Sequence, residues 1–175
     1  MGPDCGTAIV NGMPLAFANV VRRGAIGAVA ASGTGLQQVT VLVDRLGCGI
    51  SQAIGTGGRD LHREIAGISM LTGLSDLAAD PATQVIMLIS KPPAPEVAQR
   101  VLAEAARTGK PVVVSFLGAD PRSVARQGVH AVETLEDAAR AAVALLRNET
   151  PRTSYATRVD LPTDLPTLAT SQRYV

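Results

Sequence analysis

The most constraining feature of this chain is a repeated alternation between short apolar runs and longer segments whose apolar residues follow a helical period. Such alternation is typical of βα units, because neighbouring parallel strands need a crossover connection and a helix supplies it. Five apolar runs qualify as strands: residues 25–31, 50–54, 85–89, 111–117 and 128–132. The sequence therefore predicts five consecutive βα units.

This pattern predicts an α/β fold of three layers, in which a parallel sheet lies between two layers of helices. We expect a flavodoxin-like strand order, 2-1-3-4-5, in preference to a Rossmann order. The chain has two Phe, two Tyr and no Trp among its 175 residues. The core must therefore be built from Ala, Val, Ile and Leu, which suits buried strands covered by Ala-rich helices.

The regular pattern covers residues 25–147 and predicts one domain there. Residues 1–24 are rich in turn formers and contain only a short apolar alternation, which favours a loop with one short strand. We interpret them as a lead-in segment from a missing upstream domain. Residues 148–175 lose the apolar period and are rich in Thr, Pro and Arg, so a flexible linker or tail is predicted.

The formal charge of +1 argues against nucleic acid and against an anionic membrane as partners. No apolar stretch is long enough for a membrane span, and no basic segment leads into a hydrophobic one, so a cytoplasmic protein is expected. Cys5 and Cys48 lack a CxxC spacing. We therefore expect reduced thiols and no metal.

The first candidate site is the loop after the first predicted strand, which consists of Ser32, Gly33, Thr34 and Gly35. It leads directly into a helix, so backbone N–H groups and the positive end of the helix dipole would face a ligand above the sheet. That arrangement favours a phosphate or a carboxylate. A tight turn with a helix cap explains the same residues without a ligand.

The second candidate is the loop after the second strand, with Gly57, Gly58, Arg59 and Asp60. Its glycines permit close backbone approach and its guanidinium can grip an oxyanion. Pairing of Arg59 with Asp60 on the surface is the alternative. Lys91, directly after the third strand, is a candidate third cation, or a solvent-facing lysine before a proline-rich turn.

Nucleophile searches find little, because neither His62 nor His130 belongs to a recognisable Ser-His-Asp, Cys-His or HExxH arrangement. We expect His62 on a helix face and His130 in a short strand, both without a catalytic role. Cys5 lies in a turn, where a structural role is expected.

Six short segments resemble the FdrA family of acyl-CoA synthetase-like proteins, which is related to the α subunit of succinyl-CoA synthetase. They are residues 2–7, 14–19, 30–35, 53–60, 89–93 and 109–113. The resemblance implies a flavodoxin-type domain like the one that holds a phosphohistidine in the synthetases. It implies that Ser32, Gly33 and Thr34 bind an anion.

The same resemblance implies a domain border at the turn made by Gly2, Pro3, Asp4 and Cys5. In the synthetases a CoA-binding domain precedes that turn. Because no such domain precedes it here, we identify the chain as a fragment that lacks its CoA-binding domain. CoA or a nucleotide would then bind only through the missing domains.

The segment that carries the phosphorylated histidine in the synthetases is absent from this sequence. Some FdrA-type proteins are associated with oxamate carbamoyl transfer in allantoin breakdown, which the resemblance makes a candidate activity. The leading prediction is thus a domain that binds phosphate, or an acyl or carbamoyl phosphate, at its glycine loops. Expected partners are a small anion, other domains or subunits of a parent enzyme, and a second copy. The alternatives are a succinyl-CoA synthetase-like CoA ligase domain and a noncatalytic structural or interaction subunit.

Overall fold

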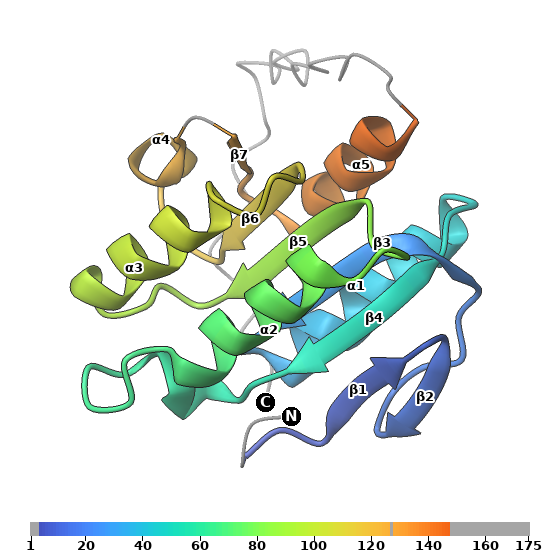
Figure 1. The fold of residues 1–175 in the computed structure, drawn as a ribbon, viewed down its shortest axis with the longest axis horizontal. Helices are drawn as coiled ribbons and strands as arrows, with labels where there is room; N and C mark the ends of the chain where they lie inside the picture. Colours follow the sequence, from blue (N-terminus) through green and yellow to red (C-terminus); the bar gives the residue numbers. More distant parts are fainter. Residues whose placement is uncertain (1–3, 127, 148–175) are drawn as a thin grey trace, which may run out of the picture.

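The computed structural model describes residues 4–126 and 128–147, which form one mixed sheet with helices on both faces (Figure 1). The strands are β1 (Thr7–Val10), β2 (Met13–Ala16), β3 (Arg23–Ala30), β4 (Ile50–Gly55), β5 (Val85–Ser90), β6 (Val112–Phe116) and β7 (Val129–Ala131). The helices are α1 (Gly33–Arg45), α2 (Ile68–Ala79), α3 (Pro95–Ala105), α4 (Pro121–Val124) and α5 (Leu135–Leu146), with a 3-10 turn, η1 (Gly58–Leu61).

The strand order is β2-β1-β4-β3-β5-β6-β7. Strands β3 to β7 are parallel to their neighbours within this set, and their sequential order is 2-1-3-4-5. The predicted α/β class and the flavodoxin-like order of these five strands are confirmed. The order reverses between β3 and β5, so the loops that follow β3, β4 and β5 lie at the same edge of the sheet.

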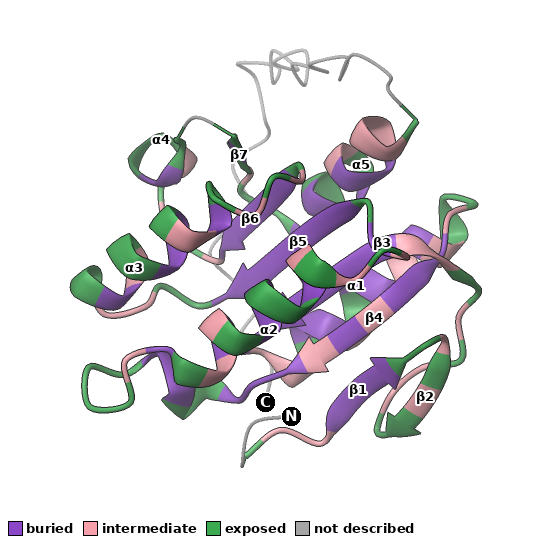
Figure 2. Ribbon diagram, viewed as in Figure 1, coloured by how far each residue is buried: buried purple, intermediate pink, exposed green. Residues whose placement is uncertain are grey.

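Two apolar clusters fill the space between the layers. Helices α1 and α5 cover one face of the sheet through residues such as Leu36, Val39 and Ala139, all fully buried. Helices α2 and α3 cover the other face through Leu74, Val101 and their neighbours. Figure 2 shows the buried central strands between helices whose outer sides are exposed. As predicted, aliphatic side chains dominate both clusters.

The N-terminal region differs from the predicted loop. Strands β1 and β2 form a hairpin, and β1 pairs antiparallel with β4, so residues from Thr7 onward extend the same sheet. Asn11 and Gly12 make the turn with φ of 51° and 79°, which matches the twist that a two-residue hairpin needs. This segment is therefore part of the domain's architecture rather than a separate lead-in. The predicted tail, 148–175, lies outside the described residues.

Among the described residues, no helix has the length and apolar character that a bilayer crossing requires.

Candidate functional site

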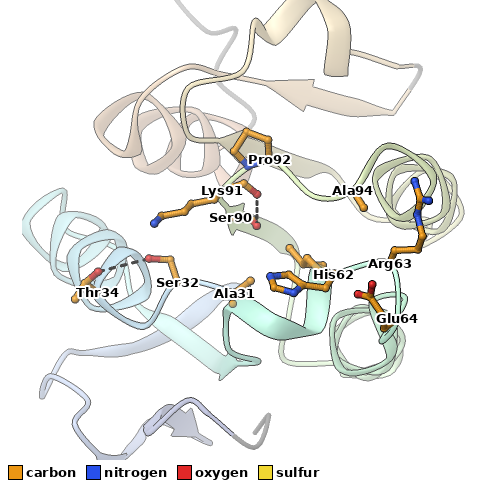
Figure 3. A pocket seen from close by; sticks show the side chains of 12 residues that line it. Ala31, Ser32, Thr34, His62, Arg63, Glu64, Ser90, Lys91, Pro92 and Ala94 are labelled. Atoms are coloured by element: carbon orange, nitrogen blue, oxygen red, sulfur yellow. Dashed lines mark hydrogen bonds between the residues drawn. The ribbon is translucent and has the colours of Figure 1, made fainter.

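A cavity of about 610 Å³ opens where β3, β4 and β5 end, and we call it the strand-end cavity (Figure 3). Three loops line it, each following one of these strands. The lining residues are Ala31, Ser32 and Thr34 after β3; Gly58, Leu61, His62, Arg63 and Glu64 after β4; and Ser90, Lys91, Pro92 and Ala94 at the end of β5 and beyond. This is the position at which open parallel sheets bind their ligands.

The loop after β3 forms the first wall. Ser32 is the N-cap of α1, and its Oγ accepts a hydrogen bond from the Gly35 backbone N–H at 3.1 Å. The Thr34 Oγ1 lies 3.5 Å from the Ser32 Oγ. N–H groups in the first helical turn have no partner within the helix, and the helix dipole makes this end positive. The wall therefore offers hydroxyl and amide donors to an anion.

Lys91 forms the wall opposite α1. It is exposed directly after β5, and its side chain points toward the first turn of α1 (Figure 3). The neighbouring Ser90 is buried, with its hydroxyl donating to the Lys91 carbonyl. The cation and the positive helix end therefore share one cavity, as the sequence predicts for Ser32, Thr34 and Lys91. Gly33 and Gly35 lie in the same helical turn but do not line the cavity.

The predicted site residues of the loop after β4 do not all face the cavity. Gly58 lines the cavity, whereas Arg59 is exposed and is not among the lining residues. Asp60 is only 3% exposed, and its two carboxylate oxygens accept hydrogen bonds from the backbone N–H groups of Ser69 and Met70, both at 2.8 Å. Asp60 thus caps α2 instead of facing a ligand. Gly57 precedes it at φ 86°, in the left-handed region that favours glycine.

His62 belongs to the cavity, contrary to its expected role on a helix face. Its imidazole lies between the loops after β3 and β5 (Figure 3). At the outer rim, Arg63 pairs with Glu96 through its Nε. The signal for His62 in the sequence is its place two residues after Asp60, directly after the second candidate loop. Its position facing the cavity depends on the path of that loop, which no local pattern specifies.

The turn that contains Asp4 and Cys5 packs against the loop after β4. A Cβ atom built on Gly55 would lie 2.3 Å from the Cys5 Sγ, and one on Gly57 would lie 1.5 Å from an Asp4 oxygen. A side chain at either position would collide with this turn, so both positions require glycine. Gly2 and Pro3 lie outside the described residues. Within the described part of the chain, no three His, Cys, Asp or Glu side chains are grouped to hold a metal ion.

Comparison with known proteins gives the class of this domain. Residues 22–118 match the CoA binding domain family. The chain belongs to this family, and the matched range runs from the start of β3 through β6, including the three loops of the strand-end cavity.

A particular relative is the uncharacterized protein YahF of Escherichia coli (strain K12). It is 53% identical over 145 residues, which are 83% of this chain and 28% of YahF. The chain therefore spans less than a third of that relative's length.

Solved structures share the fold. The crystal structure of PH0766 from Pyrococcus horikoshii OT3 aligns with a TM-score of 0.63 at 18% identity, covering 83% of this chain and 33% of PH0766. The dinucleotide forming acetyl-coenzyme A synthetase 1 of Ca. Korarchaeum cryptofilum, in its apo form, aligns with a TM-score of 0.64 at 20% identity, covering 83% and 35%.

The family match corrects two predictions. The chain is not a fragment that lacks its CoA-binding domain, because the βα units themselves are that domain. The prediction that CoA would bind only through missing domains, with phosphate or an acyl or carbamoyl phosphate as the domain's own ligand, is wrong for the same reason. A strand followed by a glycine loop and a helix occurs in many α/β domains, so these elements alone do not identify which domain of such a protein the chain represents.

Proposed function

We propose that this domain binds CoA in the strand-end cavity, through a phosphate group held between the N-terminus of α1 and Lys91. We further propose that it serves as the CoA-binding domain of a longer acyl-CoA synthetase-like protein. The observation that carries the first proposal is the convergence of a helix N-terminus and a lysine on one cavity at the reversal point of the sheet.

The donors suit a phosphate. Phosphate oxygens accept several hydrogen bonds at once, and amide groups at a helix N-terminus point in the direction that such a group needs. Lys91 adds a charge-assisted contact from the opposite wall. His62 and Gly58 also line the cavity, and a glycine allows the backbone to approach the ligand.

The role of the domain in a longer protein is supported by its relatives. Each relative compared above is about three to four times as long as the matched region, and one carries the name acetyl-coenzyme A synthetase. In such a protein this domain would hold CoA while other parts of the chain supply the acyl transfer. The residues described here contribute binding and orientation of the cofactor.

Calorimetric titration of the purified chain with CoA tests the site. We expect Lys91→Ala to weaken CoA binding by about tenfold, since a charge-assisted hydrogen bond contributes about 1.5 kcal/mol or more. Arg140→Ala, which removes the same charge from the exposed side of α5, is the matched control and should leave the affinity unchanged. Unchanged affinity in Lys91→Ala would place CoA elsewhere, and no binding to the unmodified chain would refute the proposed function itself.

A further inference from the structure

The helices do not cover the two faces of the sheet equally. Helices α1 and α5 pack on one face and α2 and α3 on the other, but no described helix lies over β1 and β2 on the α2 side (Figure 1). Successive side chains of a strand point to opposite faces. Ile9 packs in the cluster beneath α1, so its neighbours Ala8 and Val10 point to the side that no helix covers.

Large apolar side chains lie on this uncovered side of the hairpin. Met13 pairs with Val10 and Leu15 pairs with Ala8, and residues paired directly across two strands point to the same face. Val10, Met13 and Leu15 are 48%, 68% and 44% exposed. Three adjacent apolar side chains of the hairpin are therefore open to solvent on one side of the sheet.

The apolar surface continues from the hairpin onto β4 and α2. Ile54 of β4 pairs with Ala8, so its side chain lies on the same side of the sheet. Ile68, at the start of α2, is 65% exposed and lines a hollow of about 180 Å³ together with Ile54. We call this surface the hairpin face, and it consists of Val10, Met13, Leu15, Ile54 and Ile68. Exposed apolar side chains that adjoin one another in this way are typical of an interface.

The charge of the hairpin indicates which partner fits this surface. Residues 5–21 contain no Asp, Glu, Lys, Arg or His, although 18% of the whole chain is charged. A twofold axis places the same surface of two copies face to face. Charged residues would then oppose like charges, which weakens a contact, whereas an uncharged apolar surface packs on itself without this cost. A second copy of the chain therefore fits the hairpin face better than a charged partner does.

A second copy also fits the layers of the fold. Two sheets that pack face to face lie about 10 Å apart. A helix is about 10 Å wide including its side chains, so a hairpin stacked on β1 and β2 would lie at the level of α2 and beside it. The partner's hairpin would thus complete the layer that α2 and α3 leave open.

We propose that this chain forms a twofold-symmetric dimer in which the hairpin faces of two copies stack on each other. Val10, Met13 and Leu15 of each copy pack against the hairpin of the other, with Ile54 and Ile68 at the side of the contact. Strands of four residues make a small face, so we expect a dissociation constant on the order of 10 µM. None of these residues lines the strand-end cavity, so the proposal does not depend on CoA binding.

Sedimentation velocity of the full chain tests the dimer. At about 100 µM the average mass should approach twice the 18.0 kDa of one chain, and at about 1 µM it should fall close to that of one chain. Met13→Glu and Leu15→Glu bring like charges together and should each weaken dimerisation at least tenfold. Leu46→Glu replaces an exposed apolar residue at the end of α1, on the other face of the sheet, and should leave it unchanged.

Opposite charges distinguish a lost contact from a damaged fold. A mixture of Met13→Glu with Met13→Lys should form a mixed dimer that is tighter than the dimer of Met13→Glu alone, because the new charges attract. Circular dichroism should show the same fold for every variant. A chain that stays monomeric up to about 500 µM would overturn the proposal and leave the hairpin face to another part of a longer protein. A dimer that neither Met13→Glu nor Leu15→Glu weakens would overturn its assignment to the hairpin face.

Discussion

Two glycine-rich loops border the strand-end cavity, and they differ in where their polar groups are used. In the loop after β3, the Ser32 hydroxyl caps its own helix within three residues, and the first turn of α1 faces the cavity. In the loop after β4, the Asp60 carboxylate is buried and caps α2 nine and ten residues later. The first loop therefore leaves donors for a ligand, whereas the second uses its carboxylate to hold its own fold.

This contrast shows that similar composition does not imply a similar role. Both loops follow a parallel strand and both contain glycines that precede a helical turn. The two loops differ in length. A longer loop needs contacts that fix its path, and the buried Asp60 carboxylate supplies them by accepting hydrogen bonds from the start of α2. Substitution of Asp60 in the second loop should therefore affect folding above all, whereas substitution of Ser32 in the first loop should also affect binding.

The largest effect is expected for Asp60→Ala. It leaves the Ser69 and Met70 N–H groups without their carboxylate, and hydrogen bonds to a charged group contribute about 1.5–3 kcal/mol each. We expect the free energy of unfolding to fall by about 3 kcal/mol or more in urea denaturation.

Asp120→Ala is the matched control for this change, because Asp120 caps the short helix α4 through one exposed hydrogen bond to the Arg122 N–H. Its loss should cost about 0.5–1 kcal/mol. Equal effects of the two substitutions would contradict the structural role assigned to the second loop.

Gly55→Ala is expected to have the next largest effect. Its new Cβ would lie 2.3 Å from the Cys5 Sγ and 2.6 Å from the Thr7 carbonyl oxygen, so the backbone of β1 must move. Overpacking of this kind costs about 1–3 kcal/mol. Gly58→Ala, whose Cβ would meet nothing nearer than the Ala31 oxygen at 4.0 Å, should change stability by less than about 0.5 kcal/mol. Thermal or urea unfolding of both variants measures this difference in stability. A Gly55→Ala variant as stable as the unmodified chain would show that the close contact between Gly55 and the Cys5–Thr7 segment is not required.

Ser32→Ala tests the role of the first loop in stability and in binding. It removes one helix cap and should lower stability by about 1 kcal/mol. Thr134→Ala removes the equivalent cap from α5, away from the cavity, and should cost a similar amount. Only Ser32→Ala should weaken CoA binding in titration calorimetry. If both variants retain full affinity, the Ser32 hydroxyl is a cap and nothing more.

The smallest effect concerns Asp80, beyond the far end of α2. Partial burial raises the pKa of its carboxyl, but hydrogen bonds from Thr83, Ala82 and Gln52 and the nearby Lys110 outweigh this, and the pKa lies below its usual value of 3.8. A lowered pKa stabilises the folded state above pH 3.8, and that contribution is lost as the pH falls through the folded-state value.

Asp80→Asn should therefore make the unfolding free energy less dependent on pH below 3.8. Asp76→Asn, at an exposed position on α2, is the matched control for the loss of one carboxylate. An unchanged acid slope in Asp80→Asn would rule out this contribution.

Much of the fold follows from the sequence, because the apolar period reports burial directly. All five parallel strands lie where the apolar runs predict them, and Ser32 is an N-cap at the helix start predicted after the first strand. The hairpin escaped prediction although Asn11-Gly12 between apolar residues is the strongest local hairpin signal. Strand β1 of the hairpin pairs with β4, which lies about 45 residues later in the sequence. No local sequence pattern specifies such a tertiary contact.

The candidate site is less predictable. The Ser32 loop and Lys91 can be placed at one edge because parallel strands end there together. The burial of Asp60 and the cavity position of His62 depend on the path of residues 57–67, which only tertiary packing determines. The identity of the ligand comes from the family match, since glycine loops of this type accept many phosphate-bearing molecules.

The β1–β2 hairpin also has a consequence for solubility. Its two-residue turn sets Val10 opposite Met13 as a hydrogen-bonded pair, so the backbone nitrogens of Pro14 and Ala16 face the open edge. Pro14 has no N–H to offer, and Ala16 leaves the extended conformation with φ at 52°. A strand from another molecule could therefore form only part of the hydrogen bonds of a regular sheet edge. Met13 and Phe17 do expose apolar side chains beside this edge. Edge-to-edge polymerisation of copies is thus disfavoured where the sheet would otherwise be most open to it.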